Sequence, residues 1–85
     1  MRYEVKLRPA AAKVVESLDK PVRRRVLARL EELRDDPRPP QCQKLKGKEN
    51  EWRIKAGDYR IIYEIHDSVL LVKVIQVGHR REVYR

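Results

Sequence analysis

Alternation of apolar and polar side chains through the C-terminal half of the chain is the feature that most constrains its fold. Residues 52–56 alternate, Gly57-Asp58 is a turn signal, and residues 59–66 alternate again. A second turn signal, Asp67-Ser68, precedes a strongly apolar run over residues 69–77. Period-two patterns separated by short turns are typical of antiparallel strands. The pattern therefore predicts a three-stranded antiparallel meander.

The N-terminal half predicts one further strand and two helices. Residues 2–8 alternate, which indicates a half-buried strand in the same sheet. Pro9 suits the start of a helix, which Asp19-Lys20-Pro21 interrupts. Apolar residues recur at helical spacing over residues 22–33, and Asp35-Asp36-Pro37 ends this second helix. We predict an α+β fold, β-α-α-β-β-β, with a four-stranded, mainly antiparallel sheet covered on one face by a helical hairpin.

Residues 36–50 form a long connection between these halves. Loops of this length inside a compact domain are often functional. We expect Leu45 to pin the connection to the core. Cys42 lies in it without a neighbouring His or Asn in the sequence, so we interpret this thiol as incidental.

The charge balance predicts a polyanionic partner. The 85 residues hold 21 Lys and Arg against 13 Asp and Glu, a net charge of +8. The length indicates a single domain over residues 1–85. A basic domain of this size favours nucleic acid or an acidic protein as its partner. One cysteine and two histidines do not supply the usual four zinc ligands, and we expect neither a metal nor a cofactor.

The sequence also predicts a cytoplasmic location. Apolar runs such as residues 69–72 are too short to span a membrane, so we expect no membrane partner. Met1 is followed by Arg2-Tyr3-Glu4 rather than by an apolar signal segment. A lone cysteine suits a reducing compartment.

The predicted hairpin gathers cations on the face of the sheet away from the helices. A two-residue turn places Lys55 opposite Arg60, and Arg53 opposite Ile62. Continued through the second turn, the register pairs Lys73 with Ile62 on that face. Like charges directly opposite each other destabilise a sheet by a few tenths to ~1 kcal/mol. An anionic ligand would explain the pair; the alternative is that the long side chains splay into water.

These residue types can support metal-free cleavage of RNA. Such cleavage needs a base near the 2′-OH, cations on the phosphate and an acid at the leaving oxygen. Arginines suit the phosphate because they bind it bidentately and stay charged, and Lys55 beside Arg60 is a candidate base. Tyr84 either packs the tail down, stacks on a base or moves a proton. His66 lies at a turn, where we expect a solvated imidazole.

Several segments together resemble the RelE branch of the RelE/ParE toxin superfamily over nearly the whole chain. They are Lys44-Leu45-Lys46-Gly47, Trp52-Arg53-Ile54-Lys55, Tyr59-Arg60-Ile61-Ile62-Tyr63, and Gly78-His79-Arg80-Arg81-Glu82-Val83-Tyr84. The resemblance implies an mRNA interferase of a type II toxin–antitoxin system, which cuts the A-site codon on the ribosome. The 2′-OH attacks its own phosphate, leaving 2′,3′-cyclic phosphate and 5′-OH ends. It also implies a cognate antitoxin of the RelB or another small type.

The resemblance assigns roles to four catalytic residues. It implies that Arg60 binds the transition-state phosphate, that Arg80 is a phosphate ligand or the acid, and that Tyr84 orients the substrate base. Either Tyr84 or Lys55 is the general base. Arg53 departs from the family pattern, which has a pair of lysines here. Because the tail is short, the roles of Arg80 and Arg81 could be exchanged. The further RNA contacts that we expect are Lys46, Arg53, Lys73, His79 and Arg81.

Two other functions remain open from the sequence. One is a ParE-like inhibitor that binds gyrase and has no nuclease activity. The other is a non-catalytic module that binds RNA or the ribosome, for which Arg60→Lys would change affinity little. The presence of Lys55, Arg60, Arg80 and Tyr84 together favours the nuclease.

Overall fold

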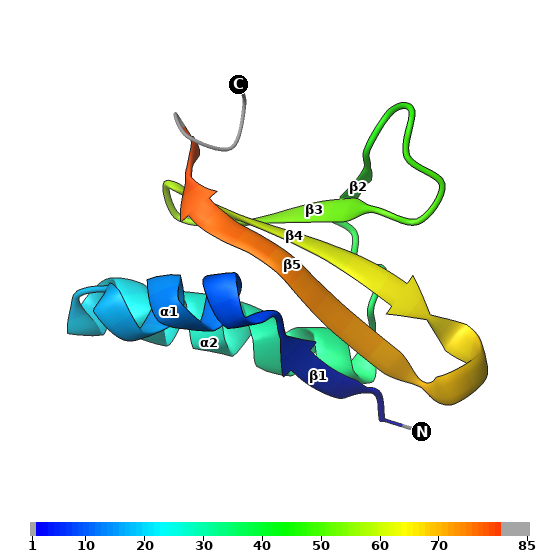
Figure 1. Ribbon diagram of the computed structural model, residues 1–85, viewed down its shortest axis with the longest axis horizontal. Helices are drawn as coiled ribbons and strands as arrows, with labels where there is room; N and C mark the ends of the chain where they lie inside the picture. The colour runs from blue at the N-terminus through cyan, green and yellow to red at the C-terminus, as the bar shows by residue number, and fades with distance from the viewer. Residues whose placement is uncertain (1, 81–85) are drawn as a thin grey trace.

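Two helices and five strands succeed one another within residues 2–80, the part of the chain that the computed structural model describes. They are β1 (Glu4–Leu7), α1 (Pro9–Ser17), α2 (Lys20–Asp35), β2 (Gln43–Lys44), β3 (Trp52–Ala56), β4 (Tyr59–His66) and β5 (Leu71–His79), with a 3₁₀ turn at Asp67–Val69. Figure 1 shows both helices on one side of the sheet, with β1 beside β5 at its edge. The predicted α+β class and helical hairpin are confirmed.

The sheet has the strand order β1-β5-β4-β3-β2. The three-stranded meander β3-β4-β5 is antiparallel, and β1 joins it parallel to β5. The sequence predicted four strands, whereas the described sheet has five, because β2 arises inside the expected loop. Its two residues pair with the start of β3, Gln43 with Arg53 and Lys44 with Trp52. A strand of two residues is too short to show a period, so only its pairing partner reveals it.

Proline and the apolar spacing account for both helices. Pro9 lies in the first turn of α1 and Pro21 in the first turn of α2, where a missing N–H costs little. Asp36 leaves the helical conformation and Pro37 follows it, which ends α2 as predicted. Each helix turns its apolar stripe to the sheet.

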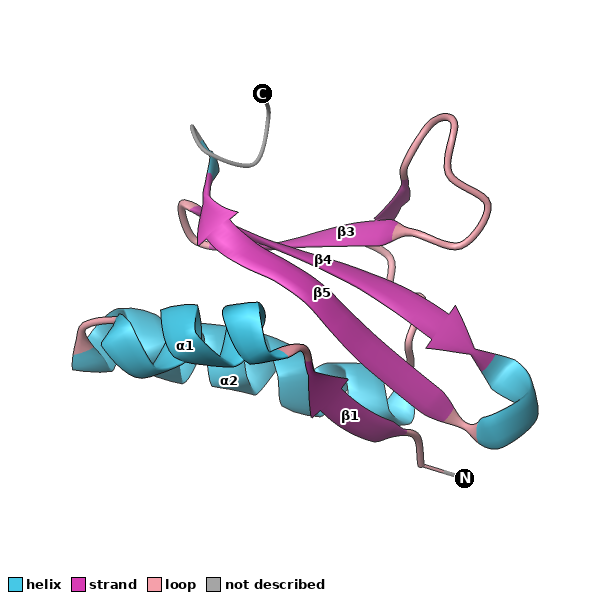
Figure 2. Ribbon diagram, in the orientation of Figure 1, coloured by secondary structure: helices cyan, strands magenta, loops and turns pink. Residues whose placement is uncertain are grey.

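The core lies between the helices and one face of the sheet. Its buried side chains are Ala11, Val15, Leu18, Val26, Leu30, Leu33, Ile54, Ala56, Ile61, Tyr63, Ile65, Val72, Val74 and Val77. Alternate residues of β3, β4 and β5 therefore point to the helices, and those between them point to the other face, here called the open face. In Figure 2 both helices lie on one side of the sheet.

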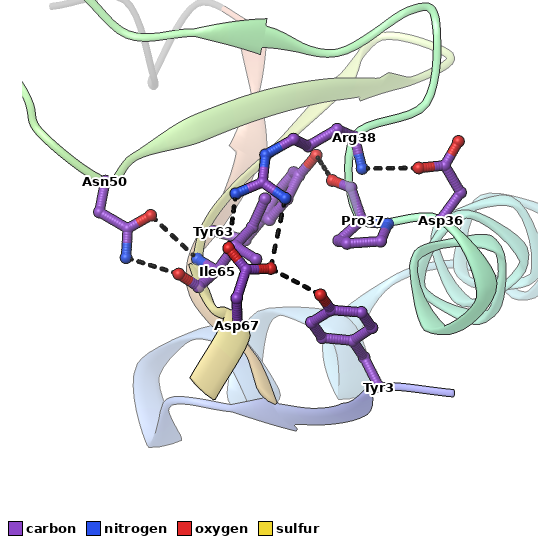
Figure 3. A network of polar contacts seen from close by, with 8 residues as sticks. All are labelled: Tyr3, Asp36, Pro37, Arg38, Asn50, Tyr63, Ile65 and Asp67. Atoms are coloured by element: carbon purple, nitrogen blue, oxygen red, sulfur yellow. Dashed lines mark hydrogen bonds and ion pairs between the residues drawn. The ribbon is translucent and has the colours of Figure 1, made fainter. Parts of the chain in front are cut away.

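A polar network ties residues 36–38 to the far end of the sheet (Figure 3). The buried Tyr63 hydroxyl donates a 2.8 Å hydrogen bond to the Pro37 carbonyl. Arg38 binds both carboxylate oxygens of Asp67 at 2.9 and 3.3 Å, and Tyr3 donates to Asp67 at 2.6 Å. The start of the long connection is thus held to β4 through Tyr63 and to the 3₁₀ turn after β4 through Asp67, which also binds Tyr3 just before β1.

Further contacts hold the remainder of the connection. The Asn50 side chain donates to the Ile65 carbonyl at 2.8 Å and accepts from its N–H at 3.4 Å. The guanidinium of Arg38 lies 5.2 Å from the centroid of the Trp52 ring, a cation–π distance. Leu45, the expected anchor, is half-buried and donates its N–H to the Glu51 carbonyl.

Candidate nucleic-acid interface

The hairpin register brings cations together on the open face, as the sequence predicts. Lys55 of β3 lies directly opposite Arg60 of β4, and Arg53 lies opposite Ile62. Their neighbours Ile54 and Ile61 are buried against the helices, so these four side chains share the open face. Ile62 is buried but lies outside the core cluster.

Arg60 is buried, although it is a charged residue on the face of the sheet that the helices do not cover. Only 6% of its surface is exposed, and its Nη1 atom donates to the carbonyls of Gly57 and Tyr59 at 3.2 Å each. The guanidinium therefore folds back over the β3–β4 turn. Gly78 of β5, the partner of Arg60 on the other side, contributes no side chain on that face.

Two further arginines reach the same turn from other elements. The N–H of Arg80, just past β5, donates to the Asp58 carbonyl at 2.9 Å. Arg25 of α2 also approaches, since a Cβ added at Gly57 would lie 3.4 Å from its Nη1 atom. Arg25 comes from α2 on the helix side of the sheet, so we name only Lys55, Arg60 and Arg80 the turn cluster. Such a concentration of positive charge favours a phosphate ligand.

Arg53 extends the cationic surface along β3. It is half-buried, and its side chain donates a hydrogen bond to the side-chain oxygen of Gln43 on β2. This bond couples the short edge strand to the open face.

A longer connection between β4 and β5 changes the predicted position of Lys73. Residues 67–70 separate the paired His66 and Leu71, so Lys73 faces Glu64, and a β-bulge between Ile62 and Tyr63 then places Gln76 opposite Ile62. The expected pairing of Lys73 with Ile62 is therefore wrong. Lys73 still points to the open face, because its neighbours Val72 and Val74 are buried, but it lies nearer the other end of the sheet.

Two other predicted contacts do not join Lys55 and Arg60 on the open face at the turn. His79 pairs with Tyr59, which packs against the core, so His79 points to the helix side; the two rings meet edge-on with centroids 5.6 Å apart. Lys46 is exposed in the connection that precedes β3, at the opposite end of β3 from the turn. Arg81 and Tyr84 lie outside the described residues.

His66 has an imidazole that is 40% exposed, in line with the solvated ring that we expected, but it also has a partner. It is half-buried at the end of β4, and its Nε2 atom lies 2.9 Å from a carboxylate oxygen of Glu64. Both residues lie on the open face, on the same strand as Arg60 but toward its other end.

Burial and hydrogen bonds shift pKa values within the polar network. Burial raises the pKa of the Tyr63 phenol far above its usual value, which keeps Tyr63 a hydrogen-bond donor. The hydrogen bonds from Arg38 and then Tyr3 lower the pKa of Asp67. This network is therefore a structural tie between the connection and the sheet.

Within residues 2–80, no group of three or more His, Cys, Asp and Glu side chains is arranged to hold a metal ion. None of the helices in this range combines the length and apolar character that crossing a membrane requires.

Sequence reasoning missed Arg25. It stands in the run Arg23-Arg24-Arg25 on a polar helix face, which is typical of a solvated surface. No local signal in the sequence places one of these arginines beside a turn some thirty residues later; the packing of α2 under β3 does so.

Comparison with known proteins identifies the family. The model of the family described as "ParE toxin of type II toxin-antitoxin system, parDE" matches residues 5–84. A protein of Escherichia coli described as RelE-like toxin is 35% identical over 82 residues, which cover 94% of this chain and 85% of that protein.

Solved structures agree with this assignment. RelE in the archaeal RelE–RelB complex from Pyrococcus horikoshii is 30% identical, with a TM-score of 0.83 over 94% of this chain and 97% of that chain. The intact E. coli RelBE toxin–antitoxin complex gives 30% identity and a TM-score of 0.80, over 91% and 95% of the two chains. The chain therefore belongs to the RelE/ParE toxin family of type II toxin–antitoxin systems, and within it is a RelE-like toxin.

Proposed function

We propose that this toxin is a ribosome-dependent mRNA endonuclease that cleaves the A-site codon without a metal and so inhibits translation. The observation that carries the proposal is the turn cluster, in which Lys55 lies opposite Arg60 and the backbone N–H of Arg80 bonds to the same β-turn. The fold gains nothing from like charges placed opposite each other. A phosphate that becomes more negative during cleavage would offset their repulsion.

The chemistry assigns each cation a task. Attack of the 2′-OH on the neighbouring phosphate builds negative charge on the phosphate oxygens, which arginine stabilises with paired N–H donors. Arg60 is suited to this task because its bonds to Gly57 and Tyr59 hold it in place before the substrate arrives. The 2′-OH proton passes to Lys55 or Tyr84, and Arg80 stabilises or protonates the leaving 5′-oxygen.

We further propose a small acidic antitoxin as the partner that neutralises the toxin in the cytoplasm. The similar RelE chains from P. horikoshii and E. coli were solved in complexes with RelB. An antitoxin segment that covers the turn cluster or displaces the Tyr84 tail excludes RNA. Cleavage of mRNA on ribosomes by a stoichiometric toxin–antitoxin complex would contradict this mode of inhibition.

A gyrase inhibitor is the second candidate function, and the family-model match to ParE toxins is the observation in its favour. It needs a protein-binding surface but no phosphate chemistry. Growth arrest with impaired supercoiling and intact mRNA would support it.

The test uses translating ribosomes programmed with a defined mRNA, with cuts mapped by primer extension. We expect cuts inside the A-site codon for the unmodified toxin, and none without ribosomes. Lys55→Ala, Arg60→Lys and Tyr84→Phe should each lose activity, by roughly a hundredfold where a transition-state donor is removed.

Lys13→Ala, which removes an exposed cation of α1, is the matched control and should cut normally. Absence of cuts with the folded, unmodified toxin would refute the nuclease. A toxin whose cuts persist in all three variants would refute the proposed site.

A further inference from the structure

A second pair of like charges lies side by side on the open face, away from the turn cluster. Lys6 of β1 is in register with Lys73 of β5. Val5 packs against the core and Val72 is buried, so both lysines point to the open face. As with Lys55 and Arg60, adjacent like charges are unfavourable for the sheet alone.

The two lysines border a hollow of about 380 Å³ at the β1 edge of the sheet. Its lining consists of three cations and three apolar residues: Lys6, Arg8, Lys73, Leu7, Pro9 and Leu71. A lining that combines cations with apolar side chains matches a ligand with an anionic group attached to an apolar or aromatic one.

The charges around this hollow are poorly compensated. In the range 2–80, Arg8 and Lys73 form no ion pair, and Lys6 has one carboxylate oxygen, of Glu4, at 3.7 Å. Glu64 faces Lys73 in the register, but its carboxylate contacts His66 instead. An added anion would therefore meet several cations whose charge is not already neutralised.

The start of α1 adds to the positive potential beside Arg8. No side chain caps this end of the helix, and its first turn contains no acidic residue. The positive end of the helix dipole thus acts in the same direction as the three cations of the hollow.

We propose that this hollow is a second nucleotide-binding site for single-stranded RNA. A phosphate lies among Lys6, Arg8 and Lys73, and its base or ribose packs on Pro9 and Leu71. The inference rests on the proposed function, because it takes RNA as the polyanion. Lys73 precedes Gly78, the neighbour of Arg60, by five strand positions, or ~16 Å. One extended RNA strand can therefore follow the open face from the hollow to the turn cluster.

The test measures ribosome-free binding of a short single-stranded RNA with 2′-O-methyl groups, which cannot be cleaved by 2′-OH attack. Fluorescence anisotropy compares the unmodified toxin with the triple variant Lys6→Ala, Arg8→Ala, Lys73→Ala. We expect the variant to bind roughly tenfold or more weakly at low salt, with a salt slope shallower by about 0.7, as expected for the loss of one neutralised phosphate.

The matched control removes three exposed cations from the helices, Lys13, Lys20 and Arg24, each replaced by Ala. It has the same net charge as the triple variant, so it measures the loss due to charge alone. Equal weakening in both variants, or unchanged affinity in the triple variant, overturns the proposal. Lys73→Gln, a single exposed substitution, gives a weaker effect in the same direction and serves if the triple variant does not fold.

Competition identifies what the hollow binds. Adenosine 5′-monophosphate should displace the RNA probe from the unmodified toxin at a lower concentration than inorganic phosphate does, and this difference should shrink in the triple variant. If adenosine 5′-monophosphate and inorganic phosphate compete equally well, the nucleotide assignment is overturned. If the triple variant instead loses binding of poly-glutamate selectively, the hollow is assigned to a protein partner. The unmodified toxin could fail to cut mRNA on ribosomes and still bind the RNA probe more tightly than the triple variant does. That result would refute the proposed nuclease function but not this binding site.

Discussion

Lys55 lies directly opposite Arg60 across the β3–β4 hairpin, so that two positive charges adjoin where the fold alone would favour opposite ones. Lys55→Glu should therefore stabilise the toxin, by a few tenths to ~1 kcal/mol of unfolding free energy, while abolishing mRNA cleavage. Urea unfolding and primer extension measure the two effects. The control Lys48→Glu makes the same charge change in an exposed loop. Equal stabilisation by both substitutions would show that the gain comes from net charge rather than from the pair.

Arg60 has a structural and a chemical task that two substitutions separate. Arg60→Ala leaves the carbonyls of Gly57 and Tyr59 without their donor, which should cost about 1–3 kcal/mol of unfolding free energy. Arg60→Lys keeps the charge and should unfold nearer the unmodified toxin, yet lose roughly a hundredfold in single-turnover cleavage. If Arg60→Lys cleaves normally, a point charge suffices and Arg60 is only a binding residue.

The β3–β4 turn depends on Gly57, whose φ is +63° and which Arg25 approaches. Gly57→Ala should lower the unfolding free energy by about 1–2 kcal/mol, because an L-residue is strained in this conformation. Gly57→Asn should cost less, since asparagine tolerates it better. Thermal and urea unfolding give the comparison. Full rescue of Gly57→Ala by Arg25→Ala would mean that crowding, not the backbone angle, causes the loss.

The ion pair of Asp67 with Arg38 predicts a pH dependence of stability. Its hydrogen bonds with Arg38 and Tyr3 hold the folded-state pKa of Asp67 below the usual 3.8. The stabilisation is therefore present above that value and is lost as the pH falls through the lower, folded-state pKa. Asp67→Asn should unfold more easily than the unmodified toxin near neutral pH, and the difference should disappear in strong acid. A difference independent of pH would instead indicate lost packing.

Burial of Tyr63 predicts that the free energy of unfolding changes at alkaline pH. Burial raises its pKa above the usual 10.0, so above that pH the unfolded chain releases the phenol proton while the folded chain keeps it. Stability should fall as the pH rises past this point, and Tyr63→Phe should remove that part of the decline. The same substitution should cost about 0.5–1.5 kcal/mol near neutral pH, through loss of the bond to Pro37. Unfolding in urea across this pH range tests both effects.

The local pattern of the sequence determined the helical hairpin, the meander and the pairing of Lys55 with Arg60. Apolar spacing records which side of a helix or strand is buried, and a two-residue turn leaves only one register for the strands that it joins. The resemblance to RelE toxins was likewise evident from short motifs in the sequence.

The tertiary structure alone decided what lies beside those elements. Strand β2, the bulge between β4 and β5, and the approach of Arg25 and Arg80 to the turn all depend on contacts between distant segments. So does the hollow at the β1 edge, where a parallel pairing joins residues nearly seventy positions apart. Periodicity carries no information about such contacts, because they are selected by the packing of whole elements rather than by the order of neighbouring residues.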